Sequence, residues 1–518
     1  AYSFLAELVH HMRLELSMAQ IRRAVYLFSR NVRDATLPLS IQMTCVRLMH
    51  HLVESIFRRR NDPAQAADAR ANLVRILDAT VAKFGSVKPQ VKTLLENGKK
   101  AEAAELEAAK KSEASRDAAF GVAPVPTRLA ASDAKEPEAK EAKEATGAKD
   151  AEEDASSKAL VGYDGATQTP ADALKSLADT KALVKTLVIG MKTLLWSITN
   201  FHGSAQQAQA QAQAPNPKGF REGELRRASG FVANGVRCLA LYQGSECAEM
   251  CTHFGEALAV LDPRSFLDII CLRLDALLGG GEPYELAPMV QLPHILLQSP
   301  ALGRSFADAL ATHLVHDRLH ALSDPQSPQS QLVLKLFSLL MHAVSKYSSC
   351  EAVLSPHVVP LVEACLKAMK EADDPSAYVR LLRYLFRALA QAKFDLLYRE
   401  VVPVLQPTLD SLLALLHGPD THELGDTVVE LCLTLPARLS SILPHLPRLA
   451  YPLLLALKSS SSELQLLGLR TLEFWVDSLN PDFLDPCIAE VESDLMLALW
   501  ALLKPQQSGA PFGAKALQ

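Results

Sequence analysis

Apolar residues recur at helical spacing in the last third of the chain, in segments that start at nearly even intervals. Successive segments start roughly 22 residues apart, so a pair occupies roughly 44 residues, within the period of about 40–47 residues of HEAT-like and armadillo-like repeats. The expected starts lie near Gln331, Pro356, Ser376, Tyr398, His422, Pro444, Glu463 and Cys487. Because one helix pair cannot bury its apolar face alone, this spacing predicts a stack of pairs, an α-solenoid.

The composition also favours helices. Hydrophobic residues make up 49% of the chain but aromatic residues only 6%, and Leu and Ala lose little conformational freedom in a helix. No sustained period-two pattern of Val, Ile and Thr bounded by turns occurs, so no sheet is expected. The predicted fold is all-α, a HEAT-like or armadillo-like solenoid interrupted by disordered linkers. Pro356, Pro403 and Pro444 are expected near helix starts, where a missing N–H is tolerated.

The N-terminal region of the chain has the same helical patterning. Ser17 is expected to cap the second helix, and Pro38 with Ser40 opens the third. Gly85 is expected to end the fourth helix, because glycine adopts the left-handed conformation that often closes a helix.

Two stretches of biased composition interrupt the helical pattern. Ala, Glu, Lys, Ser and Pro dominate residues 96–172, which have too few apolar anchors to offset the entropy of ordering. We predict a disordered linker there, with transient Ala-rich helix. A Gln/Ala tract marks a low-complexity loop over residues 203–219. The predicted organisation is therefore HEAT-like helices over 1–95, a solenoid over 173–504 and a tail over 505–518.

Charge and cysteine usage narrow the class of protein. A formal net charge of -5 gives no sign of general affinity for nucleic acid or an acidic membrane. The nine cysteines are scattered, and several sit in apolar helical runs, as expected for reduced thiols in a cytosolic or nuclear protein.

No signal peptide is apparent, and the apolar stretches are too short for a membrane span. The chain starts in mid-pattern without Met, so we expect a piece of a longer protein.

Motifs of catalysis are missing from the sequence. Residues 279–281 are three glycines, but Glu282 and Pro283 follow where a phosphate-binding loop needs Lys. Neither the kinase signature set nor a G-x-S-x-G elbow occurs. Thr421, His422 and Glu423 resemble the start of a zinc-protease motif, but Asp426 stands where the second His is required. We therefore expect no enzyme, no cofactor and no small-molecule substrate.

Two groups of residues could in principle bind a metal ion. His313, His316 and His320 would share one face of a continuous helix, where imidazoles can converge on zinc. Leu314, Val315 and Leu319 are interleaved with them, so a partly exposed helix face is the favoured interpretation.

The second group is Cys247, Cys251 and His253, which form a C-x3-C-x-H cluster. It has no second ligand pair nearby, so buried core thiols are favoured. No metal is expected at either group.

Several blocks resemble one family closely. They are residues 2–11 (YSFLAELVHH), 183–188 (LVKTLV) with Trp196, 396–400 (LLYRE), 430–441 (ELCLTLPARLSS), 468–473 (GLRTLE) and 480–484 (NPDFL). These are similar to the N-terminal HEAT region of the transformation/transcription domain-associated protein (TRRAP) family. The resemblance covers most of the chain outside the two biased stretches. The Ala/Glu/Lys-rich insertion departs from the family pattern.

The resemblance implies a function as well as a fold. The family is related to the phosphatidylinositol-3-kinase-related kinases (PI3K-related, PIKK family), but its kinase domain is a pseudokinase without catalytic residues. It provides a scaffold subunit of SAGA-type and NuA4/TIP60-type histone acetyltransferase complexes. There it receives transcription activators and brings acetylation to chromatin in the nucleus. The resemblance therefore implies a coactivator scaffold whose partners are transcription activators and subunits of these complexes.

Arginines on one expected helix face could serve an acidic activator. Arg380, Arg383 and Arg387 have i, i+3, i+7 spacing, which would place them in one basic stripe, although a solvated helix face would show the same pattern. The run at residues 58–60 is interpreted as compensation of a helix C-terminus rather than as an import signal. Basic residues elsewhere are mixed with acidic ones, so direct nucleic-acid binding is not expected.

Two other functions fit the same architecture. A HEAT-repeat transport receptor, such as a nuclear import receptor, would have a similar solenoid. The chain could also be the regulatory helical region of an active PI3K-related kinase, with intact catalytic residues elsewhere in the longer protein.

Overall fold

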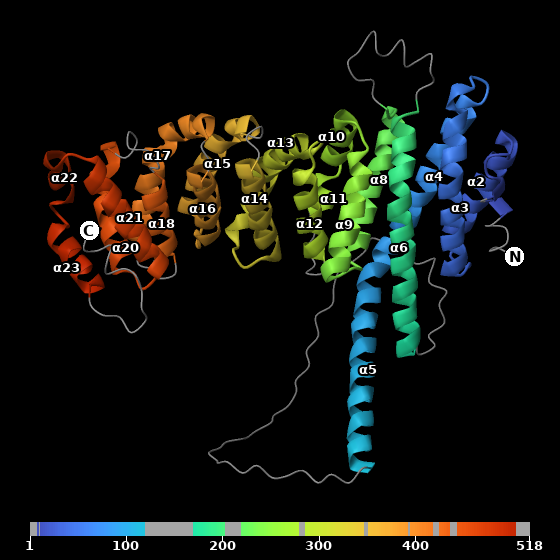
Figure 1. Cartoon of the computed structure of the whole chain (residues 1–518), viewed down its shortest axis with the longest axis horizontal. Helices are drawn as coiled ribbons and strands as arrows, with labels where there is room; N and C mark the ends of the chain where they lie inside the picture. Colours follow the sequence, from blue (N-terminus) through green and yellow to red (C-terminus); the bar gives the residue numbers. More distant parts are fainter. Residues whose placement is uncertain are drawn as a thin grey trace, which may run out of the picture. The chain divides into compact units, whose positions relative to one another are not determined.

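The structure, a computed structural model, is a succession of helices (Figure 1). It describes residues 8–9, 11–119, 169–201, 219–278, 285–346, 351–391, 394–417, 424–435 and 443–503. These segments contain no β-strand. The all-α fold class is therefore confirmed over the described part of the chain.

The helices range from single turns to 30 residues in α6. Those of the first half of the chain are α2 (Met18–Arg33), α3 (Leu39–Arg58), η1 (Arg59–Asn61), α4 (Ala66–Val87), η2 (Lys88–Gln90), α5 (Val91–Ala119), α6 (Pro170–Thr199), α8 (Glu222–Leu239) and α9 (Gly244–Ala259). Those of the second half are α10 (Pro263–Cys271), α11 (Leu274–Leu278), α12 (Leu286–Gln298), α13 (Gly303–His313), η4 (Leu314–Arg318), η5 (Leu319–Ser323), α14 (Pro328–Lys346), α15 (Glu351–Glu371), α16 (Ser376–Gln391), α17 (Asp395–Leu416), α18 (Gly425–Thr434), η7 (Leu443–His445), α20 (Leu446–Lys458), α21 (Ser462–Ser478), α22 (Pro481–Ile488) and α23 (Glu492–Leu502).

The chain divides into two units, residues 1–91 with 181–518 and residues 92–180. In the larger unit, alternate helices pack side by side. The helices α12, α14, α16, α18 and α20 contact one another in succession, and α13, α15 and α17 do the same. Each helix therefore buries its apolar side between neighbours from the previous and the next pair. This packing is that of an α-solenoid and confirms the predicted architecture.

Aromatic rings link consecutive helices in the core of the larger unit. The Phe84 ring of α4 lies 5.6 Å from the Phe231 ring of α8, and Phe231 stacks at 4.1 Å on Phe254 of α9. All three are buried. Because aromatic side chains bury large areas, this stack contributes strongly to holding the three helices together.

The helix starts predicted near Gln331, Pro356, Ser376, Tyr398, Pro444 and Glu463 agree with the structure within a few residues. The start predicted near Cys487 is wrong, because Cys487 lies near the end of α22, and the one near His422 falls outside the described residues. Ser17 caps α2 as predicted: its hydroxyl accepts a hydrogen bond from the Gln20 amide, and the Gln20 side chain accepts one from the Ser17 amide. The predicted stop at Gly85 is wrong, because α4 continues to Val87. Gly85 instead allows a close approach to α8, where an added Cβ would lie 3.3 Å from the Asn234 side chain.

Two of the prolines lie deeper in their helices than predicted. Pro356 is inside α15 and Pro403 is inside α17, because these helices begin earlier, at Glu351 and Asp395. Each interior proline removes one backbone hydrogen bond from its helix, and packing against neighbouring helices offsets this loss. Pro444 lies in the short helix η7, as predicted for a proline at a helix start.

The predicted linker over residues 96–172 needs a correction at its start. The helix α5 runs through this composition to Ala119. Its first turns bury Val91, Leu95 and Ala101, and the side chains of residues 102–110 are then exposed. Ala, Glu and Lys have high helix propensity, so they extend a helix that packing has started. Residues 120–168, the loop at 202–218 and the tail from 504 lie outside the described residues.

The helix α6 is tied to α9 by three exposed ion pairs along one side of the helix. They join Lys181 to Glu246 at 3.1 Å, Lys185 to Glu249 at 2.9 Å and Lys192 to Glu256 at 3.0 Å. Exposed pairs of this kind contribute about 0–1 kcal/mol each. They therefore help to set which turns of α6 and α9 lie side by side, and they add little to the free energy of unfolding.

Two helices, α6 and α15, are long and apolar enough to cross a membrane by length and composition. From the sequence, no apolar stretch long enough for a membrane span was expected. In the structure, 50% and 44% of their most apolar windows are buried inside the protein. Burial of this kind is typical of core helices in a helical repeat.

Candidate functional site

The three arginines predicted to form a basic stripe lie on α16. Two of them pair with one carboxylate of the neighbouring helix α18: Arg383 Nη2 lies 2.7 Å from Glu430 Oε2, and Arg387 Nη2 lies 2.5 Å from Glu430 Oε1. Arg380 is exposed and has no ion-pair partner within the described part of the chain. The structure therefore uses two arginines to join α16 to α18 and leaves one facing solvent.

Glu430 is well placed to hold this junction. Its side chain is only 14% exposed, and both of its oxygens face a guanidinium. Charge-assisted hydrogen bonds to a shared carboxylate are stronger than neutral ones. An acidic activator that bound Arg383 or Arg387 would have to displace Glu430 from them. The contact of all three arginines with such an activator stays a prediction.

The histidines considered as metal ligands do not share a regular helix face. His313 ends α13, His316 lies in the π-helical turn η4 and His320 lies in the 3-10 turn η5. The changes of helix type alter the spacing on which the prediction depended. His313 Nδ1 instead bonds Asp317 at 2.9 Å, and the His316 ring faces the His357 ring at 6.5 Å.

The Cys247–Cys251–His253 cluster is also not assembled as a ligand set. The two sulfurs lie 4.0 Å apart and are buried in α9, while His253 Nε2 lies 3.6 Å from Glu249. Within the described ranges, no group of three or more His, Cys, Asp or Glu side chains could hold a metal ion.

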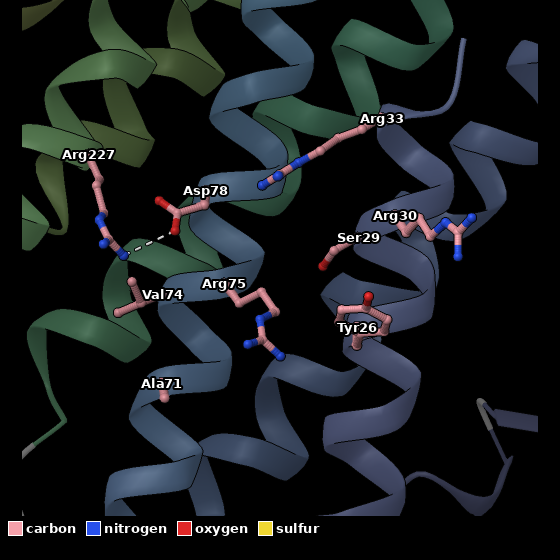
Figure 2. A pocket seen from close by; sticks show the side chains of 9 residues that line it. All are labelled: Tyr26, Ser29, Arg30, Arg33, Ala71, Val74, Arg75, Asp78 and Arg227. Atoms are coloured by element: carbon pink, nitrogen blue, oxygen red, sulfur yellow. Dashed lines mark hydrogen bonds and ion pairs between the residues drawn. The ribbon is translucent and has the colours of Figure 1, made fainter. Parts of the chain in front are cut away.

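A groove between α2, α4 and α8 was not predicted. It is an open hollow of about 500 Å³ in the larger unit. Figure 2 shows side chains from the two facing helices α2 and α4 that border it, with one more from α8. Its lining residues are Tyr26, Ser29, Arg30, Arg33, Ala71, Val74, Arg75, Asp78 and Arg227.

The groove is strongly basic. It has four arginines and a single acidic residue, Asp78. Arg227 Nη1 donates to Asp78 Oδ2 at 3.0 Å, which joins α8 to α4. Burial raises the pKa of Asp78, and the charges of Arg227, Arg33 and Arg75 oppose that shift. Among the described residues that line the groove, the one carboxylate is thus already engaged with Arg227.

The other arginines of the groove keep their charge available. Arg30, Arg33 and Arg75 have no ion pair with any residue that the structure describes. The Arg75 guanidinium lies 5.9 Å from the centre of the Tyr26 ring, a cation–π contact across the groove. Figure 2 shows Arg33 extending from α2 toward α4, and Arg75 extending from α4 toward α2. This arrangement can bind a negatively charged group.

Sequence reasoning missed the groove for a physical reason. Arg33 and Arg75 lie on different helices, and Arg227 is 149 residues beyond Asp78. Basic residues dispersed along the chain come together only when α2, α4 and α8 pack. The local signal was the i, i+3 pair Arg30 and Arg33 in the last turn of α2, which is also ordinary at a helix C-terminus.

Comparisons with known proteins match the chain along nearly all its length. The family model described as the Tra1 HEAT repeat central region matches residues 1–506. The human transformation/transcription domain-associated protein is 32% identical over 97% of the chain, and transcription-associated protein 1 of Drosophila melanogaster is 30% identical over 98%. The SAGA complex/NuA4 acetyltransferase complex subunit TRA1 of Saccharomyces cerevisiae is 26% identical over 98%. The chain spans only 13% to 15% of the length of these relatives.

Proposed function

Because the chain belongs to the Tra1/TRRAP family of HEAT-repeat proteins, we propose that it is part of the non-catalytic scaffold subunit of SAGA-type and NuA4(TIP60)-type histone acetyltransferase complexes. In this role it docks transcription activators and sibling subunits in the nucleus. The observation that carries the proposal is the family match over residues 1–506, together with relatives that are 30% and 32% identical over nearly the whole chain. The printed name of the yeast relative assigns that protein to both complexes.

The solenoid supports a scaffold because of what it presents to solvent. Helix pairs bury their apolar sides on one another and leave long outer surfaces for partners. Grooves between helices accept extended or helical segments of other proteins. The arginine groove of α2, α4 and α8 is such a surface.

Affinity purification of the native full-length protein, followed by mass spectrometry of its companions, tests the proposal. We expect acetyltransferase subunits among the companions, and fluorescence imaging should place the protein in the nucleus. Recovery of transport cargo and a GTPase without acetyltransferase subunits would support a transport receptor instead. Kinase activity of the full-length protein, with intact catalytic Asp residues beyond this chain, would overturn the non-catalytic assignment.

A further inference from the structure

We infer that the groove between α2, α4 and α8 is a docking site for an acidic peptide segment that also carries an aromatic or apolar side chain. The inference rests on the proposed function in that such a segment belongs to a protein docked on the scaffold. Its basis is the set of residues that line the groove and their charges.

The excess of positive charge in the groove favours a negatively charged partner. Figure 2 shows Arg33 extending from α2 toward α4 and Arg75 extending from α4 toward the Tyr26 ring. Arg30 also borders the groove, with its guanidinium turned away from α4, and Asp78 is held by Arg227. Like charges gathered in one hollow repel each other in the free protein. A chain with a net charge of -5 has many carboxylates, yet none of the described ones pairs with these three arginines. Carboxylates of a partner would relieve the repulsion and form bidentate pairs with the guanidinium groups.

The groove also has an apolar component. The Tyr26 ring is 59% exposed at its border, and Ala71 and Val74 of α4 line it. A Tyr with one face in solvent offers a contact surface for an aromatic or aliphatic side chain. An acidic segment with an interspersed Phe or Leu would therefore use both kinds of contact, which a small inorganic anion could not.

The size and placement of the basic residues favour a peptide over a nucleic acid. The hollow of about 500 Å³ is large enough for a few side chains. Binding to duplex DNA instead uses a long row of phosphate contacts along a basic face. Here the free arginines gather at a single hollow between neighbouring helices.

The geometry is partly fixed before a partner arrives. The 3.0 Å ion pair from Arg227 to Asp78 holds α8 against α4 on one side of the groove. The contact of Arg75 with the Tyr26 ring positions that guanidinium on the other side. Such preorganisation lowers the entropic cost of binding.

Fluorescence anisotropy of the full-length protein with a labelled peptide rich in Asp and Glu around a central Phe tests the site. The double variant Arg33→Gln/Arg75→Gln should weaken binding by about tenfold or more, as expected when two charge-assisted contacts are lost. Tyr26→Ala should also weaken it, although no charge changes. The matched control is Arg23→Gln/Arg226→Gln, which removes the same charge from exposed positions of α2 and α8 outside the groove and should bind as the parent does.

Several results would overturn the inference. Equal losses in the groove variant and the control would mean non-specific attraction, and no loss in the groove variant would exclude the site. Tighter, Arg33- and Arg75-dependent binding of a phosphopeptide or of duplex DNA would assign another ligand. Circular dichroism must show the same helix content for all variants. If acetyltransferase subunits still co-purify while the peptide does not bind, only this inference fails and the scaffold proposal stands.

Discussion

Arg70 of α4 and Glu224 of α8 form a buried ion pair between segments 154 residues apart in the chain. Arg70 Nη2 lies 2.6 Å from Glu224 Oε2, and both side chains are 10% exposed or less. Arg70 also donates to the Gly219 carbonyl at 2.9 Å. Burial pushes the pKa of Glu224 upward, but the hydrogen bonds and charges of Arg70 and Arg221 outweigh it and lower the pKa overall. The pair therefore fixes how α8 enters the stack.

Replacing Arg70 by Ala should loosen α4 and α8. The change leaves the Glu224 carboxylate buried without its main partner, which typically costs about 3–5 kcal/mol. Hydrogen–deuterium exchange is the suitable measurement, because a long solenoid can open locally rather than in one step. Amides of α4 and α8 should exchange faster than in the parent. Arg22→Ala is the control, since Arg22 pairs with Asp68 at 3.8 Å on the exposed surface; equal exchange in both variants would contradict the prediction.

Gly190 of α6 marks a close contact with α3. A Cβ at this position would overlap the ring of His50, so the two helices can approach only because residue 190 has no side chain. Gly190→Ala should therefore lower the unfolding temperature, with a cost of about 1–3 kcal/mol, as in other overpacked cores. Gly223→Ala on α8 is the control, because nothing lies within 4 Å of its added Cβ. A Gly190→Ala protein as stable as the control would show that α6 can shift.

Single replacements of the α16 arginines should have different effects on hydrogen exchange, because two of these arginines pair with Glu430 and Arg380 does not. Arg383→Ala removes one of the two partners of the largely buried Glu430 and should reduce protection of α16 and α18 from hydrogen exchange. Arg380→Ala should leave exchange unchanged, because Arg380 is exposed. Activator binding by the triple Ala variant, measured by anisotropy, then tests the predicted stripe. If binding is unchanged, these arginines have no part in docking.

Helices were predictable from the sequence because their signal is local. In the sequence, Ile41, Cys45, Leu48, Leu52 and Ile56 follow one another at helical spacing, and in α3 all of them are buried except Ile41, which is half-buried. Apolar spacing could not show that α5 continues past Ala101, since that extension depends on helix propensity rather than on burial. The 3.6-residue period therefore indicates which part of a helix packs against its neighbours, but it does not indicate where the helix ends.

The candidate sites were less predictable because they depend on contacts between distant helices. In the sequence, Arg383 and Arg387 belong to a stripe of arginines with no evident partner. Their partner in the structure, Glu430, lies 43 residues beyond Arg387. The groove required α2, α4 and α8 to meet, and two segments of biased composition separate α4 from α8. Charges on one helix can be counted from a sequence, but their neutralisation by another helix cannot.

The half-buried His50, whose Nε2 atom is shielded from solvent, should make the stability of the protein depend on pH. Burial, and then the nearby charge of His51, lowers the pKa of His50 from 6.5 to about 4. The unfolded chain therefore binds more protons than the folded one between these two values. Stability should be full above pH 6.5 and fall as the pH drops from 6.5 toward 4. The His50 Nε2 atom has no hydrogen-bond partner in the described structure, so no contact offsets the charge.

His50→Gln should remove this part of the pH dependence. The difference between the unfolding temperatures at about pH 7 and about pH 5 should be smaller in the variant than in the parent, because Gln does not titrate. His320→Gln is the control, since His320 is exposed, and it should keep the parent's difference. Thermal unfolding followed by circular dichroism at the two pH values gives the comparison. An unchanged difference in His50→Gln would mean that other groups titrate in this range and that α3 and α6 accommodate a charged His50 at their contact.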